Sequence, residues 1–371
     1  MAEADGGGDG GGGPKSDSDT EAVLADGESL TPEEVARVAR EDARVVVPDE
    51  AREKVRTARE RVEEVVESGE PVYGVNTGFG ELVDERIPRD DVEQLQLNLV
   101  RSHAAGAGRE LAREEVRALL LGRLNALVKG YSGVRESVVD LLAAMLNERI
   151  HPVVKSRGSL GASGDLAPLA HLALVLVGEG EAEVERDGEG SEGTEGGDGR
   201  TERLPGDEAL AAADLEPLTL RAKEGIALIN GTQLTVGLAS LAVVDAERAV
   251  RAADVAGSLT TEVTMGTTAS ADESIAAVRP HAGHAESARN VKLLTRNSEV
   301  VESHRNCDRV QDAYSLRCLP QVHGAVRDAI AHLREAVEVE LNSATDNPLV
   351  FDGERVSSRA RSSTPSNGRS G

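Results

Sequence analysis

Residues 158–171 read Gly-Ser-Leu-Gly-Ala-Ser-Gly-Asp-Leu-Ala-Pro-Leu-Ala-His, a run of small residues that leads directly into an apolar segment. At its centre are Ala162, Ser163 and Gly164. Because glycine tolerates backbone bends that other residues avoid, the Gly164 amide nitrogen can reach the carbonyl carbon of Ala162. Ring closure with loss of water, and loss of a second water from Ser163, would leave an exocyclic methylidene. The triplet therefore indicates a carbon electrophile made without an external cofactor.

Two other interpretations of this segment are weighed against the electrophile. An Asp before an apolar run is an ordinary helix start, with Asp165 as the cap and Pro168 in the first turn. The nucleophile elbow of serine hydrolases needs Gly-x-Ser-x-Gly, but counting from Gly161 places Asp165 where the last glycine belongs. The hydrolase interpretation therefore fails, and the residues alone leave the helix start and the electrophile open.

The composition excludes several classes of protein. The chain has 371 residues, enough for one large or two ordinary domains, and a formal net charge of -25, which argues against nucleic-acid binding. Six lysines against 35 arginines, an acidic excess and very few aromatic residues are typical of halophilic proteins, whose surface charge maintains solubility in salt.

The sequence also indicates where in the cell the chain works. Two cysteines are too few for a disulfide framework and lack the spacing of a metal site, so we expect a reducing cytoplasm. The Gly/Asp-rich N-terminus does not read as a signal peptide, and no apolar run approaches the length of a membrane span.

Periodicity and capping signals predict a mostly helical chain. Thr31-Pro32-Glu33-Glu34 is a capping-box pattern that starts a helix. Further helices are expected over 48–68, over 114–150 with a break at 130–133, over 218–254, and up to Leu341. Residues 1–28 are expected to form a disordered low-complexity tail. The segment 179–208 has twelve acidic against three basic residues and is expected to form an acidic surface loop, with a hairpin tip as one form of it.

Polar residues in unusual surroundings are candidates for function. Tyr73 lies in a glycine-rich loop over 72–80, and Ser102-His103 lies in an apolar stretch that suggests a buried pair. Asn230 interrupts an apolar run, so it needs hydrogen-bond partners or a cavity.

Two more groups of polar side chains occur near the C-terminal end. Gln311, Tyr314 and Arg317 share one face of a helix or tight turn by their spacing, and Arg317 could hold a carboxylate; a solvated stripe is the alternative. His281 and His284 lack a third metal ligand at sensible spacing, so we expect a surface loop there and no metal.

Four blocks of the sequence, in order, resemble the aromatic amino acid lyases, and most closely their histidine-specific members. These blocks are 73–80, 158–171, 228–233 and 310–320, and the resemblance covers residues from about 30 to 355. Ser102-His103 supports the histidine-specific members, because relatives that prefer phenylalanine have apolar residues there. The resemblance implies a mainly α fold, shared with the fumarase and aspartase group, in which long central helices assemble a homotetramer with active sites shared between subunits.

The resemblance also implies a reaction and a role for each candidate. Ala162, Ser163 and Gly164 would form 4-methylidene-imidazol-5-one autocatalytically, and the enzyme would eliminate ammonia from L-histidine to give urocanate, without metal or external cofactor. Tyr73 would be the base, which requires that nearby cations or helix N-termini favour its anion. His103 would bind the substrate imidazole and Arg317 its carboxylate. Asn230, Gln311 and Tyr314 would orient the amine and the electrophile.

The same resemblance suggests how the chain divides into domains and leaves several alternative functions open. It suggests an N-terminal domain over 29–217, the start of a central helical domain over 218–355, and an unrelated Ser/Arg-rich tail over 356–371. The family would continue with a Gly-Gly-Asn-Phe-His-Gly segment and more helices, so we expect a truncated or frame-shifted chain. A phenylalanine or tyrosine ammonia-lyase, a related aminomutase, and an inactive fragment remain alternatives.

Overall fold

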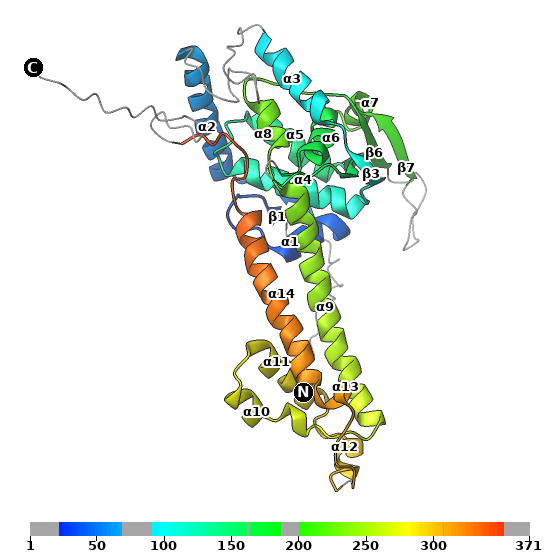
Figure 1. The fold of residues 1–371 in the computed structure, drawn as a ribbon. Coiled ribbons are helices and arrows are strands. Elements are labelled where there is room, and N and C mark those ends of the chain that lie inside the picture. Colours follow the sequence, from blue (N-terminus) through cyan, green and yellow to red (C-terminus); the bar gives the residue numbers. More distant parts are fainter. Residues whose placement is uncertain (1–21, 69–90, 162–163, 187–199, 307, 352–371) are drawn as a thin grey trace, which may run out of the picture.

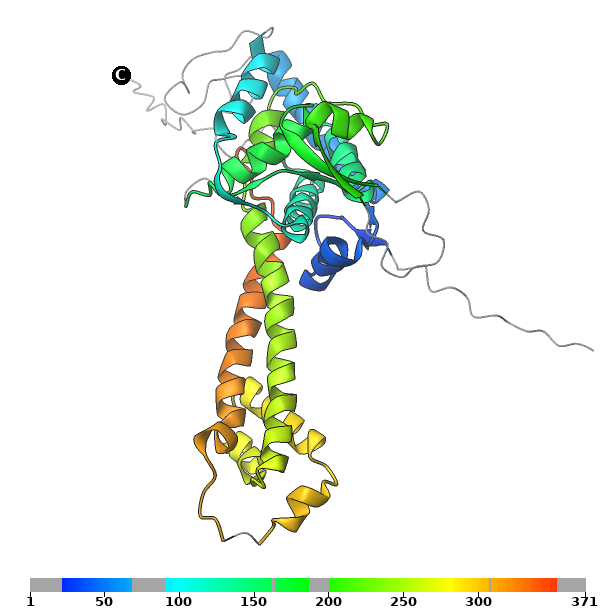
Figure 2. The same ribbon diagram turned by 90° about the vertical axis from the view of Figure 1, so that its right-hand side faces the viewer.

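The computed structural model describes residues 22–68, 91–161, 164–186, 200–306 and 308–351. It shows a large lobe and a small helical lobe at opposite ends of a pair of long helices, and the view in Figure 2 shows the same arrangement after a quarter turn (Figures 1 and 2). We call these parts the large lobe and the distal lobe.

Helices dominate the described part of the chain, as the sequence predicted. In the large lobe they are α1 (Pro32–Glu41), α2 (Asp49–Ser68), α3 (Val92–His103), α4 (Arg113–Val128), α5 (Glu136–Asn147), α6 (Leu166–Leu176), α7 (Gly206–Ala211) and α8 (Glu224–Ile229). The long pair is α9 (Gln233–Val263) and α14 (Leu319–Leu341). The distal lobe holds a 3₁₀ turn (Ala269–Ala271), α10 (Glu273–Val278), α11 (Ala282–Leu294), α12 (Glu299–Ser303) and α13 (Tyr314–Arg317).

Short strands form three small sheets in the large lobe. The strands are β1 (Val23–Leu24), β2 (Val45–Val46), β3 (Ala107–Glu110), β4 (Ile150–Pro152), β5 (Lys155–Arg157), β6 (Glu181–Arg186) and β7 (Arg200–Pro205). β1 pairs with β2 in parallel, β3 pairs antiparallel with β5, and β4, β6 and β7 form an antiparallel sheet in that order.

The core of the large lobe surrounds α4. Every residue of α4 from Val116 to Val128 is buried, and α4 contacts α1, α5 and α9. A helix that is buried on all sides needs apolar residues around its circumference, and α4 accordingly lacks a strong polar face. α1 begins as predicted, with Thr31 and Glu34 completing a capping box.

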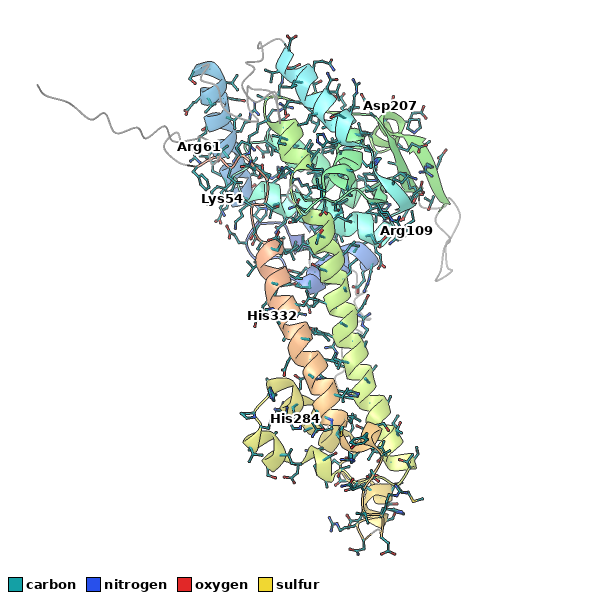
Figure 3. All side chains as sticks on the ribbon, viewed as in Figure 1. Lys54, Arg61, Arg109, Asp207, His284 and His332 are labelled. Carbon is teal, nitrogen blue, oxygen red and sulfur yellow. The ribbon has the colours of Figure 1, made fainter. Side chains whose placement is uncertain are left out.

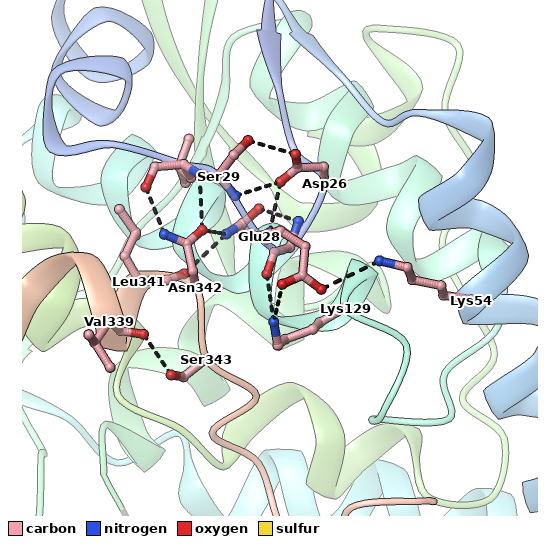
Figure 4. Close-up of polar contacts among 12 residues, drawn as sticks. Asp26, Glu28, Ser29, Lys54, Lys129, Val339, Leu341, Asn342 and Ser343 are labelled. Atoms are coloured by element: carbon pink, nitrogen blue, oxygen red, sulfur yellow. Dashed lines mark hydrogen bonds and ion pairs between the residues drawn. The ribbon is translucent and has the colours of Figure 1, made fainter. Parts of the chain in front are cut away.

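The α9/α14 pair separates the two lobes. α9 has 31 residues, so at about 1.5 Å per residue it spans roughly 46 Å. Near the large lobe, α14 is tied to the N-terminal segment by Asn342, whose Oδ1 accepts from the Leu30 N–H and whose Nδ2 donates to the Leu30 carbonyl (Figure 4). Asn125 of α4 donates to the Leu341 carbonyl at the end of α14. The helix therefore ends against the core, where turn residues were predicted to stop it.

Three expectations differ from the structure. Residues 22–28 are not part of a disordered tail, because β1 pairs with β2 and the Gly27 N–H donates to buried Asn125; residues 1–21 lie outside the described part. Strands β6 and β7 occupy both ends of the acidic segment 179–208, whose tip 187–199 is also not described. The expected surface loop around His281 and His284 is wrong, because His281 caps α11 and His284 is buried in the distal lobe (Figure 3).

None of the described helices is both long enough and apolar enough to cross a membrane.

Candidate functional site

The start of α6 and the turn between α8 and α9 meet at a close backbone contact. Gly164 has φ +77°, and a Cβ there would lie 2.1 Å from the Gly231 carbonyl oxygen, so only glycine fits this position. Gly164 also closes a tight turn, since its N–H donates to the Leu160 carbonyl at 2.9 Å and its own carbonyl accepts from the Leu160 N–H at 2.8 Å. The structure thus confirms the sharp bend that the sequence suggested at Gly164; Ala162 and Ser163 lie outside the described residues.

Asp165 fastens this contact to the start of α9. Its N–H donates to the Gly231 carbonyl at 2.6 Å, and its buried carboxylate accepts from the Ser159 hydroxyl and from the N–H and hydroxyl of Thr235. Asp165 occupies the N-cap position of α6, but its side chain makes no capping hydrogen bond there. The predicted position of Asp165 at the helix start is confirmed, but the capping hydrogen bond is absent, because the carboxylate joins two segments that are distant in sequence.

Asn230 is brought beside the same contact. It ends α8, where its N–H donates to the Ile226 carbonyl, and it directly precedes Gly231. Gly231 in turn packs against three polar side chains: a Cβ there would lie 2.2 Å from Gln233 Oε1, 2.7 Å from Arg123 Nη1 and 3.0 Å from Thr345 Oγ1. The segments that contain Gly164 and Asn230 were expected to lie close together, and they do so within one chain.

A buried cluster of cations lies behind this turn. Arg123 and Lys223 are both fully buried, and the Lys223 ammonium pairs with Asp346 at 2.9 Å. Burial lowers the pKa of Arg123 to about 10, with Asp346 opposing the change, and burial also lowers the pKa of Lys223. Asp346 is thus the acidic group that acts on both buried cations.

His103 lies at the C-terminal end of α3, about half-buried, while Ser102 is exposed, so the expected buried pair is wrong for this chain. His103 Nδ1 lies 2.8 Å from the Leu99 carbonyl, which can only accept, so the proton is on Nδ1 and Nε2 is an acceptor. The Ser102 hydroxyl donates to the same carbonyl. This arrangement fixes the tautomer of His103.

Gln311, Tyr314 and Arg317 lie in the distal lobe, at the other end of α9 from Gly164 (Figure 1). α13 contains Tyr314 and Arg317 but not Gln311, which precedes it without helical structure, so the shared helical face is only partly right. The Arg317 guanidinium lies 4.1 Å from the centre of the Tyr314 ring, in a cation–π contact, and Tyr314 is 72% exposed.

The single chain therefore brings together some predicted site residues and separates others. Gly164 and Asn230 lie together, whereas Gln311, Tyr314 and Arg317 lie about one helix length away; Tyr73 is outside the described residues. Arg123, Gln233 and the role of Asp165 in joining two segments were not predicted from the sequence. Gln233 could have been found from its place directly after Asn230-Gly231-Thr232, but the approach of Arg123 from α4 is a tertiary contact without a local signal.

Other candidate features do not coincide with this site. A cavity of about 600 Å³ between β2 and α5 contains none of the predicted site residues. Within the described ranges, no group of three or more His, Cys, Asp or Glu side chains could hold a metal ion.

Comparison with known proteins identifies relatives over most of the chain. A model of the aromatic amino acid lyase family matches residues 30–368. A probable histidine ammonia-lyase from Halobacterium salinarum is 64% identical over 341 residues, covering 92% of this chain and 62% of the relative. The histidine ammonia-lyase of Gloeobacter violaceus is 52% identical, covering 90% of this chain and 62% of the relative. The chain thus spans slightly less than two thirds of the length of these relatives.

Solved structures show the same fold. Tyrosine aminomutase from Streptomyces globisporus superimposes with a TM-score of 0.80 at 40% identity, covering 91% of this chain and 64% of that one. Histidine ammonia-lyase from Trypanosoma cruzi superimposes with a TM-score of 0.77 at 36% identity, covering 91% and 60%. Both a lyase and an aminomutase therefore share this arrangement of helices.

Proposed function

The chain belongs to the aromatic amino acid lyase family, and from this premise we propose that it acts as a histidine ammonia-lyase, eliminating ammonia from L-histidine to give urocanate. The observation that carries the proposal is the contact of Gly164 with Gly231, directly beside Asn230. This contact supports the proposal, because the segment expected to form the electrophile meets the residue that directly follows Asn230, the asparagine expected to orient the substrate. The names of the curated relatives support histidine as the substrate.

The described residues fit an electrophile formed from Ala162, Ser163 and Gly164. At position 164 the backbone has the bend and lack of space that only glycine accepts. The Gly164 N–H donates to the Leu160 carbonyl, so ring closure has to break this hydrogen bond. When present, 4-methylidene-imidazol-5-one supplies the electrophilic carbon that ordinary side chains lack.

His103 is proposed to select the substrate ring. Its Nδ1 proton is held by the Leu99 carbonyl, so Nε2 is free to accept a hydrogen bond from an imidazole N–H. A polar ring in a dry pocket needs such a partner, whereas a phenyl ring gains nothing from it. This argument favours histidine over phenylalanine and tyrosine.

The distal residues are proposed to act in a neighbouring subunit. Arg317 would hold the substrate carboxylate, and Gln311 and Tyr314 would orient the amine, but in one chain they lie a helix length from Gly164. A homotetramer with shared active sites resolves this separation. Exposed apolar side chains along the α9/α14 pair support self-association: Val255, Leu259, Val263, Val322, Val326, Leu333 and Val339.

Tyr73 is proposed as the base that removes the β-proton of the substrate. A free phenol titrates near ~10, so the anion would require a positive environment at neutral pH. We further propose that the enzyme works in the cytoplasm at high salt, which the acidic, lysine-poor composition supports.

A substrate panel tests the function. L-histidine, L-phenylalanine and L-tyrosine are offered separately, at low and at molar salt, and product is followed by ultraviolet absorbance. We expect urocanate from histidine, with more activity in salt. Cinnamate or coumarate as the main product would instead support the phenylalanine or tyrosine lyase, and a β-amino acid product would support an aminomutase. If no substrate is converted, the chain is an inactive fragment.

Replacing His103 tests its role in selection. His103→Leu should lower kcat/KM for histidine by about tenfold or more, because one hydrogen bond in the pocket contributes about 1 kcal/mol and its loss leaves the substrate ring unpaired. Activity on phenylalanine should not fall. His281→Leu is the control, since His281 is exposed at the start of α11 and its side chain makes no capping hydrogen bond. Equal losses on both substrates would show that His103 does not select the ring.

A further inference from the structure

Arg123 lies directly behind the backbone contact that holds Gly164. Its Nη1 donates to Gln233 Oε1 at 2.7 Å, and Gln233 Nε2 donates to the Thr345 hydroxyl at 2.6 Å. The backbone of Gly231 lies against these side chains on one side and against Gly164 on the other. A continuous chain of contacts therefore runs from Arg123 through Gln233 and Gly231 to Gly164.

The rest of the Arg123 guanidinium has no evident structural use. Its Nε and Nη2 are buried and have no hydrogen-bond partner among the residues that the structure describes. Asp346, the acidic group whose charge acts on Arg123, is already paired with Lys223 and with the Ser132 hydroxyl. A buried charge without full pairing destabilises a protein, and an apolar side chain of similar volume would pack there at lower cost.

Arg117 shows what a structural arginine looks like in the same helix. It is equally buried in α4, but its guanidinium donates to the carbonyls of Val38 and Leu146 and contacts His151 Nε2. Two buried arginines of one helix thus differ in two respects. Arg117 is paired and remote from the candidate site, whereas Arg123 is incompletely paired and contacts it.

We propose that Arg123 is a positioning residue for formation of the electrophile: through Gln233 it fixes Gly231 against Gly164 and so holds Gly164 in the bend that ring closure requires. This inference rests on the proposed function. A site that tolerates a poorly paired buried cation at the point of contact is expected where local stability is sacrificed for function.

The reaction that Arg123 is inferred to assist loses two waters. The Gly164 nitrogen bonds to the Ala162 carbonyl carbon, and the carbonyl oxygen leaves as water with the hydrogens of the Gly164 and Ser163 nitrogens. The second water takes the Ser163 hydroxyl and its α-hydrogen.

Ring formation is measured directly, without an activity assay. The chain is denatured and digested at successive times after synthesis, and the fraction of the peptide containing residue 164 that has lost two waters is followed by mass spectrometry. Arg123→Met should slow this loss at least about tenfold relative to the unmodified chain. The figure is the lower end of the loss in affinity or activity seen when a residue that orients a metal ligand is removed. Gln233→Leu should slow it similarly. Arg123→Lys, which keeps a charge and a donor, should recover part of the rate.

Arg117→Met is the matched control, and rates are compared per folded molecule as measured by circular dichroism. We expect this variant to lose more stability than Arg123→Met but to form the ring at the unmodified rate. If Arg123→Met forms the ring as fast as Arg117→Met, the inference is overturned and the proposed function survives. If the unmodified chain never loses the two waters, the proposed function itself fails.

Discussion

At the scale of single residues, the site depends most on the glycine whose side-chain hydrogen cannot be replaced. Gly164→Ala should prevent ring formation and destabilise the fold by at least about 1–3 kcal/mol, because φ is +77° and the new Cβ would meet the Gly231 carbonyl oxygen. Mass spectrometry of the digested chain checks the ring, and thermal unfolding checks the stability.

The same turn offers a control for this substitution. Gly161 lies three residues earlier, and a Cβ there would meet no atom of the described residues within 4 Å. Gly161→Ala should therefore leave both ring formation and stability close to those of the unmodified chain. Equal effects of the two substitutions would show that the turn tolerates no change at all, and that the Gly164 contact has no special role.

The sequence predicted the residues of this site better than their contacts. The triplet at 162–164 and Asn230 followed from residue type and from the resemblance, because small residues before a helix and an asparagine in an apolar run are local signals. The roles of Asp165 and Arg123 did not follow. Asp165 bonds Thr235, 70 residues away, and Arg123 bonds Gln233, 110 residues away, so only the fold brings them together.

At the scale of helices and strands, start and stop signals predicted helices well and strands poorly. α1 begins at its capping box, and α14 ends at Leu341, as expected. The antiparallel pair of β6 and β7 agrees with the hairpin that was one form of the expected loop, but its strands were not predicted. Glu181 to Arg186 nevertheless alternates acidic and apolar residues, with Ala182 and Val184 buried. The high charge of the segment favoured a loop, yet alternation is the stronger signal because it matches the period of a strand.

Buried His151 in β4 should make the stability of the fold depend on pH. Burial, and then Arg117 and Arg113, lowers the pKa of His151 to about 3 from an ordinary value near 6.5. Between these values the unfolded chain binds a proton that the folded chain does not. The contribution to stability is therefore complete above about pH 6.5 and is lost as the pH falls toward 3, by at most about 1.4 kcal/mol per pH unit.

Denaturant unfolding between about pH 5 and 6.5 checks this prediction, since most carboxylates titrate lower. In the unmodified chain Arg117 donates to His151 Nε2, and His151→Gln keeps an acceptor for this hydrogen bond. The substitution should reduce the dependence of stability on pH. Part of the slope should remain, because burial and Lys155 also lower the pKa of His171. An unchanged slope in the variant would exclude His151 as the source.

At the scale of the whole molecule, a single chain holds Gly164 and Arg317 at opposite ends of α9. Residue spacing cannot reveal this separation, because it is set by α9, whose 31 residues span roughly 46 Å from the turn at Gly231 to the distal lobe. Either the distal residues have no part in catalysis, or another copy of the chain supplies them. The exposed apolar side chains along the α9/α14 pair favour the second explanation.

Mixing two inactive variants distinguishes these explanations. Asn230→Ala removes a large-lobe residue and Arg317→Ala a distal one, and each alone should be inactive. Co-expressed, they should regain roughly a quarter of the unmodified activity, since in a randomly mixed oligomer each of the two required residues is intact at about half of the sites. Histidine turnover and the mass of the intact oligomer are measured on the same preparation.

The choice of partners makes this experiment specific to shared sites. Asn230→Ala with Gly164→Ala should not regain activity, because both residues lie at the same end of one chain and every site takes them from the same copy. Recovery in this control pair would mean that mixing merely stabilises the fold. If mixed oligomers of Asn230→Ala and Arg317→Ala stay inactive, the active sites are not shared between copies of the chain. Arg317 would then have no part in binding the substrate, because α9 separates it from Gly164 within one chain.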